Sequence, residues 1–422
     1  EIAQCLVGSE MCIRDRADIV LSKINNVPMF GGAKLADFDE SLKSGMIEYI
    51  SQDVITAYLD EVQKQQVHPE ICPASGLKVV YTPLNGTGNK PVRAILKRIG
   101  INDVTVVPEQ EMPDGNFPTC PFPNPEIKEA LHLGLELCKK VKPDLLLATD
   151  PDCDRVGIAV PDKNGDYVLF SGNEVGAMLL EYICKERIKL GTMPEKPVAV
   201  KSIVTTAIAS EIAEEYGVEM RNVLTGFKFI GEQIGLLEAA HEEYRYIFGF
   251  EESYGYLAGT YVRDKDAVVA SMLICEMAAY YRSIGMSLLD AREAMYKKYG
   301  NYVHTVESFT CEGASGMEEM AKIMDDLHAN TPDSIAGFKV VKVADYLSSV
   351  TTDLATKKTE PITLPKSDVI CFTLENGATV IIRPSGTEPK IKAYYTTIAA
   401  NRADAEALSK KLSADFKAKL GF

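Results

Sequence analysis

The sequence has no tryptophan, which by itself excludes no function, and no Cys-x-x-C pair among its ten cysteines. Without such spacing, neither a disulfide framework nor a zinc site is predicted, and scattered thiols are typical of a reducing, cytoplasmic setting. No apolar run reaches the roughly 18 residues that a membrane-spanning helix needs. Basic residues are fewer than acidic ones, 45 against 60, and the net charge is −15. This balance argues against nucleic-acid and membrane partners, so basic residues that do cluster are interpreted as local anion sites.

The 422 residues are many for a single core and predict several domains. Residues 1–16 show neither a clear period nor the pattern of a signal peptide, and we predict that they are non-native. Strand and helix patterns then alternate, which predicts two α/β/α domains over 51–171 and 172–302, each with a mixed, mainly parallel sheet. From 303 to 422, several strands and two helices predict a separate C-terminal α+β domain.

Several local signals predict individual elements. Val54, Ile55, Tyr58, Leu59 and Val62 recur every three or four residues, which predicts an amphipathic helix capped by Ser51. Asn124-Pro125-Glu126 predicts another helix start, with Asn124 as the cap. The polar segment 348–367 is predicted to be a loop.

The most informative motif is Asp150-Pro-Asp-Cys-Asp-Arg155, which directly follows the apolar run 144–149. That run predicts a buried strand, and ligand sites of parallel α/β sheets lie at the carboxyl ends of strands. Asp150, Asp152 and Asp154 alternate, so their carboxylates can converge on one hard cation. Mg²⁺ prefers such oxygen ligands and keeps positions open for substrate phosphate. The alternative is a solvated acidic turn, although three clustered anions would repel one another without a cation.

A second motif, Arg383-Pro-Ser-Gly-Thr-Glu-Pro-Lys390, follows a strand predicted over 379–382. Arg383 offers a planar fork that matches phosphate oxygens, and Ser385 and Thr387 add hydroxyl donors. Gly386 allows backbone N–H groups to approach an anion closely. We therefore predict a phosphate site, and the alternative is an ordinary Ser-Gly turn.

Three motifs in the second domain are less specific. Glu251 and Ser253 are two residues apart, so in an extended turn they would point the same way and could bind neighbouring sugar hydroxyls. Lys265 is a candidate acid/base because burial lowers a lysine pKa readily. Lys228 could reach an anion at a helix start. The alternatives are a strand end facing water, a solvated helix start, and a turn glycine beside an exposed lysine.

Together and in this order, the motifs resemble those of the α-D-phosphohexomutase superfamily, which includes phosphoglucomutases and phosphomannomutases. The resemblance covers residues 17–422 and is closest to the bacterial phosphoglucomutase and phosphopentomutase-like branch. It implies four domains around one cleft, the last of them a mobile, TATA-box-binding-protein-like lid. It also implies the following site residues: Asp150, Asp152 and Asp154 for Mg²⁺; Lys265 and Arg155 for catalysis; and Thr225, Gly226, Phe227, Lys228, Glu251, Ser253, Arg383, Ser385, Gly386 and Thr387 for the substrate.

The sequence departs from the family pattern in two places. The family's nucleophile is a serine in a T-A-S-H-N-P-type loop, whereas Ser75 lacks the His-Asn-Pro continuation. Residues 17–50 are therefore predicted to be the remnant of a first domain, and the chain to be N-terminally truncated and inactive alone. The other departure is Asn85, where relatives commonly carry histidine.

The implied activity is that of an intramolecular phosphotransferase acting on a phosphorylated sugar. Glucose 1-phosphate and glucose 6-phosphate would interconvert through a phosphoserine and glucose 1,6-bisphosphate, with Mg²⁺ offsetting charge on the transferring group. Phosphopentomutase and phosphomannomutase activities are alternatives, because the substrates differ by one carbon or one hydroxyl. A haloacid-dehalogenase-type phosphatase fits less well, because it gives Arg383 no role. A non-catalytic sugar-phosphate-binding protein would explain the missing serine. The sequence does not determine the oligomeric state.

Overall fold

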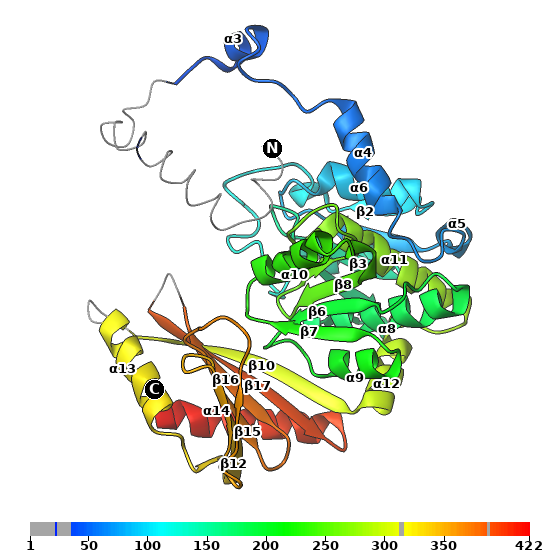
Figure 1. Ribbon diagram of the computed structural model, residues 1–422. Helices are drawn as coiled ribbons and strands as arrows, with labels where there is room; N and C mark the ends of the chain where they lie inside the picture. Colours follow the sequence, from blue (N-terminus) through cyan, green and yellow to red (C-terminus); the bar gives the residue numbers. More distant parts are fainter. Residues whose placement is uncertain (1–21, 23–34, 312–315, 386–388) are drawn as a thin grey trace.

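The computed structural model describes residues 22, 35–311, 316–385 and 389–422 (Figure 1). The segment predicted to be non-native, 1–16, therefore lies outside the described residues, as do Gly386 and Thr387 of the predicted phosphate site. From residue 35 onward, the chain forms a short helix, α3 (Phe38–Lys43), and then the helices and strands of three sheets.

The first sheet is mixed and has five strands. Their order is β2 (Asp103–Val106), β1 (Lys78–Thr82), β3 (Leu145–Thr149), β4 (Val156–Pro161) and β5 (Tyr167–Phe170). β1 runs parallel to both of its neighbours, whereas β4 and β5 are antiparallel additions.

The central strand of this sheet, β3, is buried on both faces, as its unbroken apolar run predicts. Leu145 and Leu147 pack in one core cluster, whereas Leu146 and Ala148 pack in another. The first cluster includes side chains of α4 (Gln52–Gln63) and α6 (Asn89–Arg98), and the second includes Cys138 of α7 (His132–Val141).

The second sheet is also mixed, with the order β7 (Glu219–Val223), β6 (Val198–Ser202), β8 (Tyr246–Glu251) and β9 (Gly255–Leu257). Its helices are α8 (Gly172–Leu190), α9 (Ile208–Glu215), α10 (Phe227–Ala239), α11 (Ala267–Ser283) and α12 (Leu288–Tyr299). Helix α11 is buried from Ala267 to Tyr281 because it contacts both β9 and, in the preceding domain, α6 and α5 (Ile71–Ser75). The first two sheets therefore share a helix in one core.

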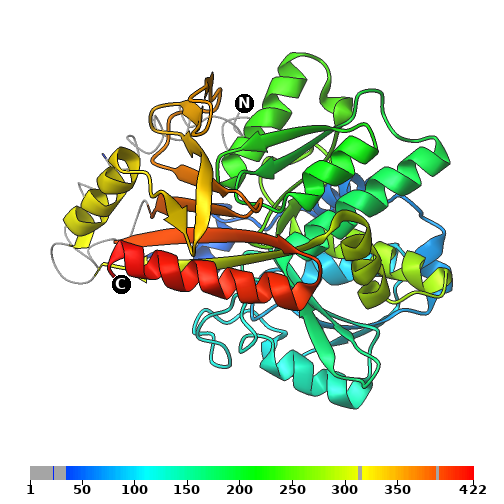
Figure 2. The same ribbon diagram turned by 90° about the horizontal axis from the view of Figure 1, so that it is seen from below.

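The third sheet is antiparallel in all of its described pairs. Its order is β10 (Asn301–Thr310), β17 (Lys390–Ala399), β16 (Thr379–Pro384), β15 (Ile370–Leu374), β12 (Phe338–Asp345), β13 (Val350–Asp353) and β14 (Thr359–Pro361), with β11 (Ser334–Ile335) beside β12. Helices α13 (Gly316–Ala329) and α14 (Arg402–Leu420) share a core cluster with the sheet, and Figure 2 shows α14 lying along it. The predicted fold class, two mixed α/β domains and a C-terminal α+β domain, is confirmed.

Two local predictions are wrong. Residues 126–131 form turns, and α7 begins only at His132, because Asn124 closes a short turn by accepting the N–H of Glu126 (2.9 Å). The polar segment 348–367 contains β13 and β14. These strands are held by backbone pairing at the edge of the sheet, so they need no apolar alternation.

Among the described helices, none is long and apolar enough by itself to cross a membrane. Helices α11 and α12 would meet the criterion only as a pair, and they are bent by 88° relative to each other.

Candidate functional site

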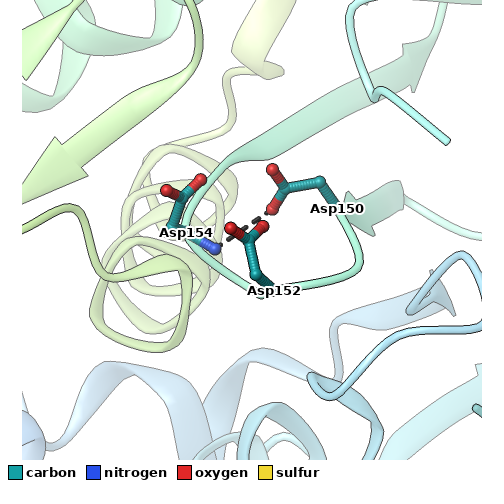
Figure 3. A group of neighbouring side chains, drawn as sticks. All are labelled: Asp150, Asp152 and Asp154. Carbon is teal, nitrogen blue, oxygen red and sulfur yellow. Dashed lines mark hydrogen bonds between the residues drawn. The ribbon is translucent and has the colours of Figure 1, made fainter. Parts of the chain in front are cut away.

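The aspartate loop, residues 150–155, connects β3 to β4 at the carboxyl end of β3. Oδ1 of Asp150 accepts the backbone N–H groups of Asp154 (3.0 Å) and Arg155 (2.9 Å), and Cys153 has a φ of 62°. This tight turn brings one oxygen each of Asp150, Asp152 and Asp154 within 4.8 Å of one another (Figure 3). The alternating spacing thus produces a convergent set of carboxylates.

The electrostatics of the aspartate loop fit a hard divalent cation. Burial, and the charges of Asp154 and Asp152, raise the pKa of Asp150 to about 7. Within the described residues, the buried Oδ1 of Asp154 has no hydrogen-bond partner, and Nε of Arg155 lies 3.7 Å from it. A cation with oxygen ligands would relieve the repulsion and satisfy this atom.

Lys265 reaches the aspartate loop from the second sheet's domain. Its Nζ lies 2.9 Å from Oδ2 of Asp154 and 2.8 Å from Oδ1 of Asp264. The side chain of Lys265 has room to reach the loop because residue 255 is glycine. A Cβ at residue 255 would lie only 2.1 Å from Cδ of Lys265. Burial lowers the pKa of Lys265, but the two carboxylates raise it, and the net shift is upward. The pKa of Lys265 is therefore raised, and the lowering that we expected from burial does not prevail.

Backbone hydrogen bonds also join the aspartate loop and the start of β4 to the domain of the second sheet. The N–H of Val156 donates to the carbonyl of Tyr254 (3.1 Å), and the N–H of Ala267 donates to the carbonyl of Cys153 (3.1 Å). The first bond reaches the turn between β8 and β9, and the second reaches the start of α11. The loop is thus held in place by two domains.

Glu251 connects two of the predicted motifs. It ends β8, is buried, and accepts the N–H of Gly226 through Oε1 (2.7 Å). Gly226 has a φ of 120°, which a residue with a side chain would rarely adopt. Burial and the charge of Glu252 raise the pKa of Glu251 to about 7. Ser253 lies in the tight turn 252–254, so the extended turn that we expected is not formed.

The remaining residues of the 225–228 motif surround the start of α10. The hydroxyl of Thr225 is buried and has no partner within the described part of the chain. Phe227 is buried, and its ring centre lies 5.4 Å from Nζ of Lys265. Lys228 stands in the first helical turn, with Nζ 5.0 Å from the ring centre of Phe229.

Arg383 lies near the end of β16, and its Nε donates a hydrogen bond to the hydroxyl of Tyr394 on β17 (3.2 Å). The N–H of Ser385 donates to the carbonyl of Lys390 (2.7 Å). Arg383 is directly opposite Lys392 in the strand pair, so both cations occupy one face of the sheet. Tyr394, on the same face, packs against Val204 of the second sheet's domain. This face therefore contacts the domain that contains Glu251.

Charges from all three sheets act on Glu126. Its Oε1 lies 3.7 Å from Nη1 of Arg155. Burial raises the pKa of Glu126, Glu252 raises it further, and Arg155 and Lys392 lower it. Residues in or beside the predicted metal, sugar and phosphate motifs therefore act on Glu126, and the region around it is the candidate site.

Sequence reasoning missed several residues of this region. The sequence marks Glu126 only as part of a predicted helix start, and Lys392 and Tyr394 resemble ordinary strand residues. Lys201 had a detectable signal, because it is a charged residue within the buried strand β6. Its Nζ donates to the carbonyl of Thr205 (3.2 Å), and burial lowers its pKa to about 8. Asn85 instead donates to the carbonyls of residues 109 and 112, which gives it a structural role.

Comparison with known proteins identifies the family of the two α/β domains. Residues 56–165 match the domain described as phosphoglucomutase/phosphomannomutase, alpha/beta/alpha domain II, and residues 171–299 match domain III of the same family. The phosphoglucomutases of Staphylococcus aureus strains MRSA252 and N315 are 40% and 39% identical to the chain over 324 residues. These matches cover 77% of this chain and 57% of each relative, so the chain spans little more than half of their length.

Solved structures share the fold at low sequence identity. The pp63/parafusin phosphoglucomutase of Paramecium, in its open form, has a TM-score of 0.61 at 16% identity, covering 86% of this chain and 62% of that one. A phosphoglucomutase/phosphomannomutase family protein of Burkholderia thailandensis has a TM-score of 0.58 at 17% identity, covering 90% and 68%. From the two matched domains and the Staphylococcus relatives, we conclude that the chain belongs to the phosphoglucomutase/phosphomannomutase family of the α-D-phosphohexomutase superfamily.

Proposed function

We propose that this chain provides the metal, sugar and phosphate sites for the reversible transfer of phosphate between carbon 1 and carbon 6 of glucose phosphate. The observation that carries the proposal is the convergence on Glu126 of charged residues from all three sheets. The 40% identity to Staphylococcus phosphoglucomutases favours glucose phosphate over the mannose and pentose alternatives. The activity belongs to the cytoplasm, where sugar phosphates and free thiols are both expected.

Each motif has a part in the proposed reaction. Asp150, Asp152 and Asp154 would hold Mg²⁺, which when bound offsets charge on the transferring phosphoryl group. Lys265, whose Nζ lies beside Asp154, would exchange a proton with a sugar hydroxyl, and Arg155 would stabilise charge next to it.

The substrate would be held from both ends. Glu251 and Ser253 would bind the sugar hydroxyls, with Thr225, Gly226, Phe227 and Lys228 orienting the ring. Arg383 and Ser385, with Gly386 and Thr387, would bind the phosphate group that is not reacting. Glucose 1,6-bisphosphate would be the intermediate, since it presents a phosphate to each end.

We further propose that these 422 residues alone bind phosphorylated sugars without turning them over. The T-A-S-H-N-P-type loop that would provide the nucleophilic serine does not occur in the sequence. Isomerisation of glucose 1-phosphate by the purified chain, followed by a coupled assay for glucose 6-phosphate, would contradict this.

Replacing Glu251 by glutamine tests the recognition of the sugar. The introduced amide can still accept the N–H of Gly226, but it lacks the charge that strengthens a hydrogen bond from a sugar hydroxyl. Calorimetric titration should show about a tenfold loss of affinity for glucose 1,6-bisphosphate in the presence of Mg²⁺, and no loss for inorganic phosphate.

Glu232→Gln, on the exposed face of α10, is the matched control and should bind both ligands like the unmodified chain. Equal losses for both ligands in Glu251→Gln would indicate a structural role for Glu251. If the unmodified chain bound neither ligand, the proposed function of these residues would be wrong.

Replacing Lys265 by methionine is expected to tighten Mg²⁺ binding. Nζ of Lys265 occupies the same carboxylate, Asp154, that the cation would use, so the ammonium group competes with the metal. Removing one partly buried cation should improve affinity by about 1 kcal/mol, or roughly fivefold, in calorimetric titrations. Lys163→Met, at an exposed turn, serves as the control. Weaker binding by Lys265→Met would mean that the lysine supports the metal site rather than competing with it.

A further inference from the structure

We infer that Tyr394 is a positioning residue whose hydroxyl fixes the guanidinium group of Arg383 for phosphate binding. The inference rests on the proposed function, because it assumes that Arg383 binds a phosphate group of the sugar. No motif of the sequence includes Tyr394, and its role comes from the strand pairing of the third sheet.

The pairing of β16 and β17 places Tyr394 beside Arg383. Ile381 is opposite Tyr394, and Arg383 is opposite Lys392, so all four side chains lie on one face of the sheet. Nε of Arg383 donates to the hydroxyl of Tyr394 at 3.2 Å. The guanidinium carbon lies 5.9 Å from the centre of the tyrosine ring. This bond uses only Nε, so it leaves Nη1 and Nη2 to form the planar fork that matches phosphate.

Tyr394 is itself held rigidly. The residue is only 7% exposed, and its ring packs in a cluster with Val204, Val369 and Ile381. Val204 belongs to the segment that follows β6, so the ring packs against both the second sheet's domain and the third sheet. A buried tyrosine ring has few conformations, and its hydroxyl normally has a hydrogen-bond partner. The guanidinium group of Arg383 is therefore hydrogen-bonded to a side chain whose position is set by packing, and we call this hydrogen bond the tether.

The tether matters because carboxylates are close by. The charges of Glu252 and Glu251 both act on Tyr394, and burial raises the pKa of Tyr394, so its hydroxyl is neutral near pH 7. An arginine on a flexible stem would be attracted to these carboxylates, which would neutralise the charge that a phosphate needs. The hydrogen bond from Nε opposes this movement and keeps the fork directed toward the ligand.

Tyr394→Phe tests the inference, because it removes the hydroxyl and keeps the packed ring. The matched control is Tyr395→Phe. The ring of Tyr395 packs on the opposite face against Phe416, and its buried hydroxyl has no hydrogen-bond partner among the described residues. Calorimetric titration of inorganic phosphate and of glucose 6-phosphate should show about a five- to tenfold loss of affinity in Tyr394→Phe. Tyr395→Phe should bind like the unmodified chain, and both variants should melt within about 2 °C of it.

A double-mutant cycle with Arg383→Lys separates positioning from packing, because lysine keeps a charge but lacks the Nε donor and the fork. In this background Tyr394→Phe should cause little further loss, since the interaction that it removes is already absent. Full additivity of the two losses would overturn the inference. Unchanged affinity in Tyr394→Phe would also overturn it and leave the proposed function intact. Failure of the unmodified chain to bind either ligand would overturn both.

Discussion

Replacing Asp150 by asparagine is expected to abolish metal binding and, at the same time, to stabilise the metal-free chain. The introduced side chain can still accept the N–H groups of Asp154 and Arg155 through its oxygen, so the turn of the aspartate loop should persist. The variant lacks the charge, however, and a metal ligand is lost. Affinity for Mg²⁺ should fall by more than about 100-fold, beyond the roughly 10- to 100-fold loss typical of residues that only support a ligand.

The stabilisation follows from the raised pKa of Asp150. This pKa is about 7 in the folded chain, against an ordinary value of about 4. Between these values the unfolded chain has released the proton while the folded chain keeps it, so the free energy of unfolding decreases as pH rises. Above this window the destabilisation is complete. Asparagine has no charge and therefore avoids this destabilisation. Above pH 7 the free energy of unfolding of Asp150→Asn should exceed that of the unmodified chain by about 1–3 kcal/mol, and near pH 4 the two should be almost equal.

Denaturant unfolding of the metal-free chain at several pH values measures this difference. Asp152→Asn is the matched control, because Asp152 belongs to the same carboxylate set but is exposed. It should weaken metal binding without a comparable gain in stability. A less stable Asp150→Asn chain above pH 7 would show that the buried carboxylate strengthens the loop more than its charge destabilises it.

Replacing Arg383 by alanine should nearly eliminate the binding of glucose 1,6-bisphosphate. The fork of Arg383 can form two charge-assisted hydrogen bonds with one phosphate group. Hydrogen bonds to charged groups contribute about 1.5–3 kcal/mol each, so a loss of about 3 kcal/mol, or roughly 100-fold in affinity, is expected. The measurement is calorimetric titration in the presence of Mg²⁺, compared with the unmodified chain.

Arg383→Lys distinguishes charge from geometry in this experiment. Lysine keeps the positive charge on the same face of the sheet but has no planar fork, so it should restore only part of the affinity. Arg282→Ala provides a control for the loss of an arginine, because Arg282 pairs with Asp144 outside the convergent region. If Arg383→Ala bound the bisphosphate like the unmodified chain, phosphate recognition would have to reside elsewhere.

Much of the fold could be predicted from the sequence, because helices and strands follow from local periodicity. The helix predicted after Ser51 begins at Gln52, and the strand predicted before Asp150 spans Leu145–Thr149. Periodicity does not show, however, which other elements pack against the apolar face of a helix. In α4 the predicted stripe is only partly buried: Val54 is 57% exposed, whereas Leu59 is 3% exposed. Only the packing of α4 against α6 and α11 decides which half is covered.

The sequence by itself determined which polar and charged side chains stand together in each loop. Three aspartates at alternating positions can converge because a single tight turn joins them. Contacts between distant segments were decided only by the tertiary structure. The pairing of Lys265 with Asp154, the bond from Gly226 to Glu251 and the tether of Arg383 to Tyr394 all depend on how strands and domains pack. Such contacts leave no periodic signal, because they arise from nonlocal burial and strand register rather than from the order of neighbouring residues.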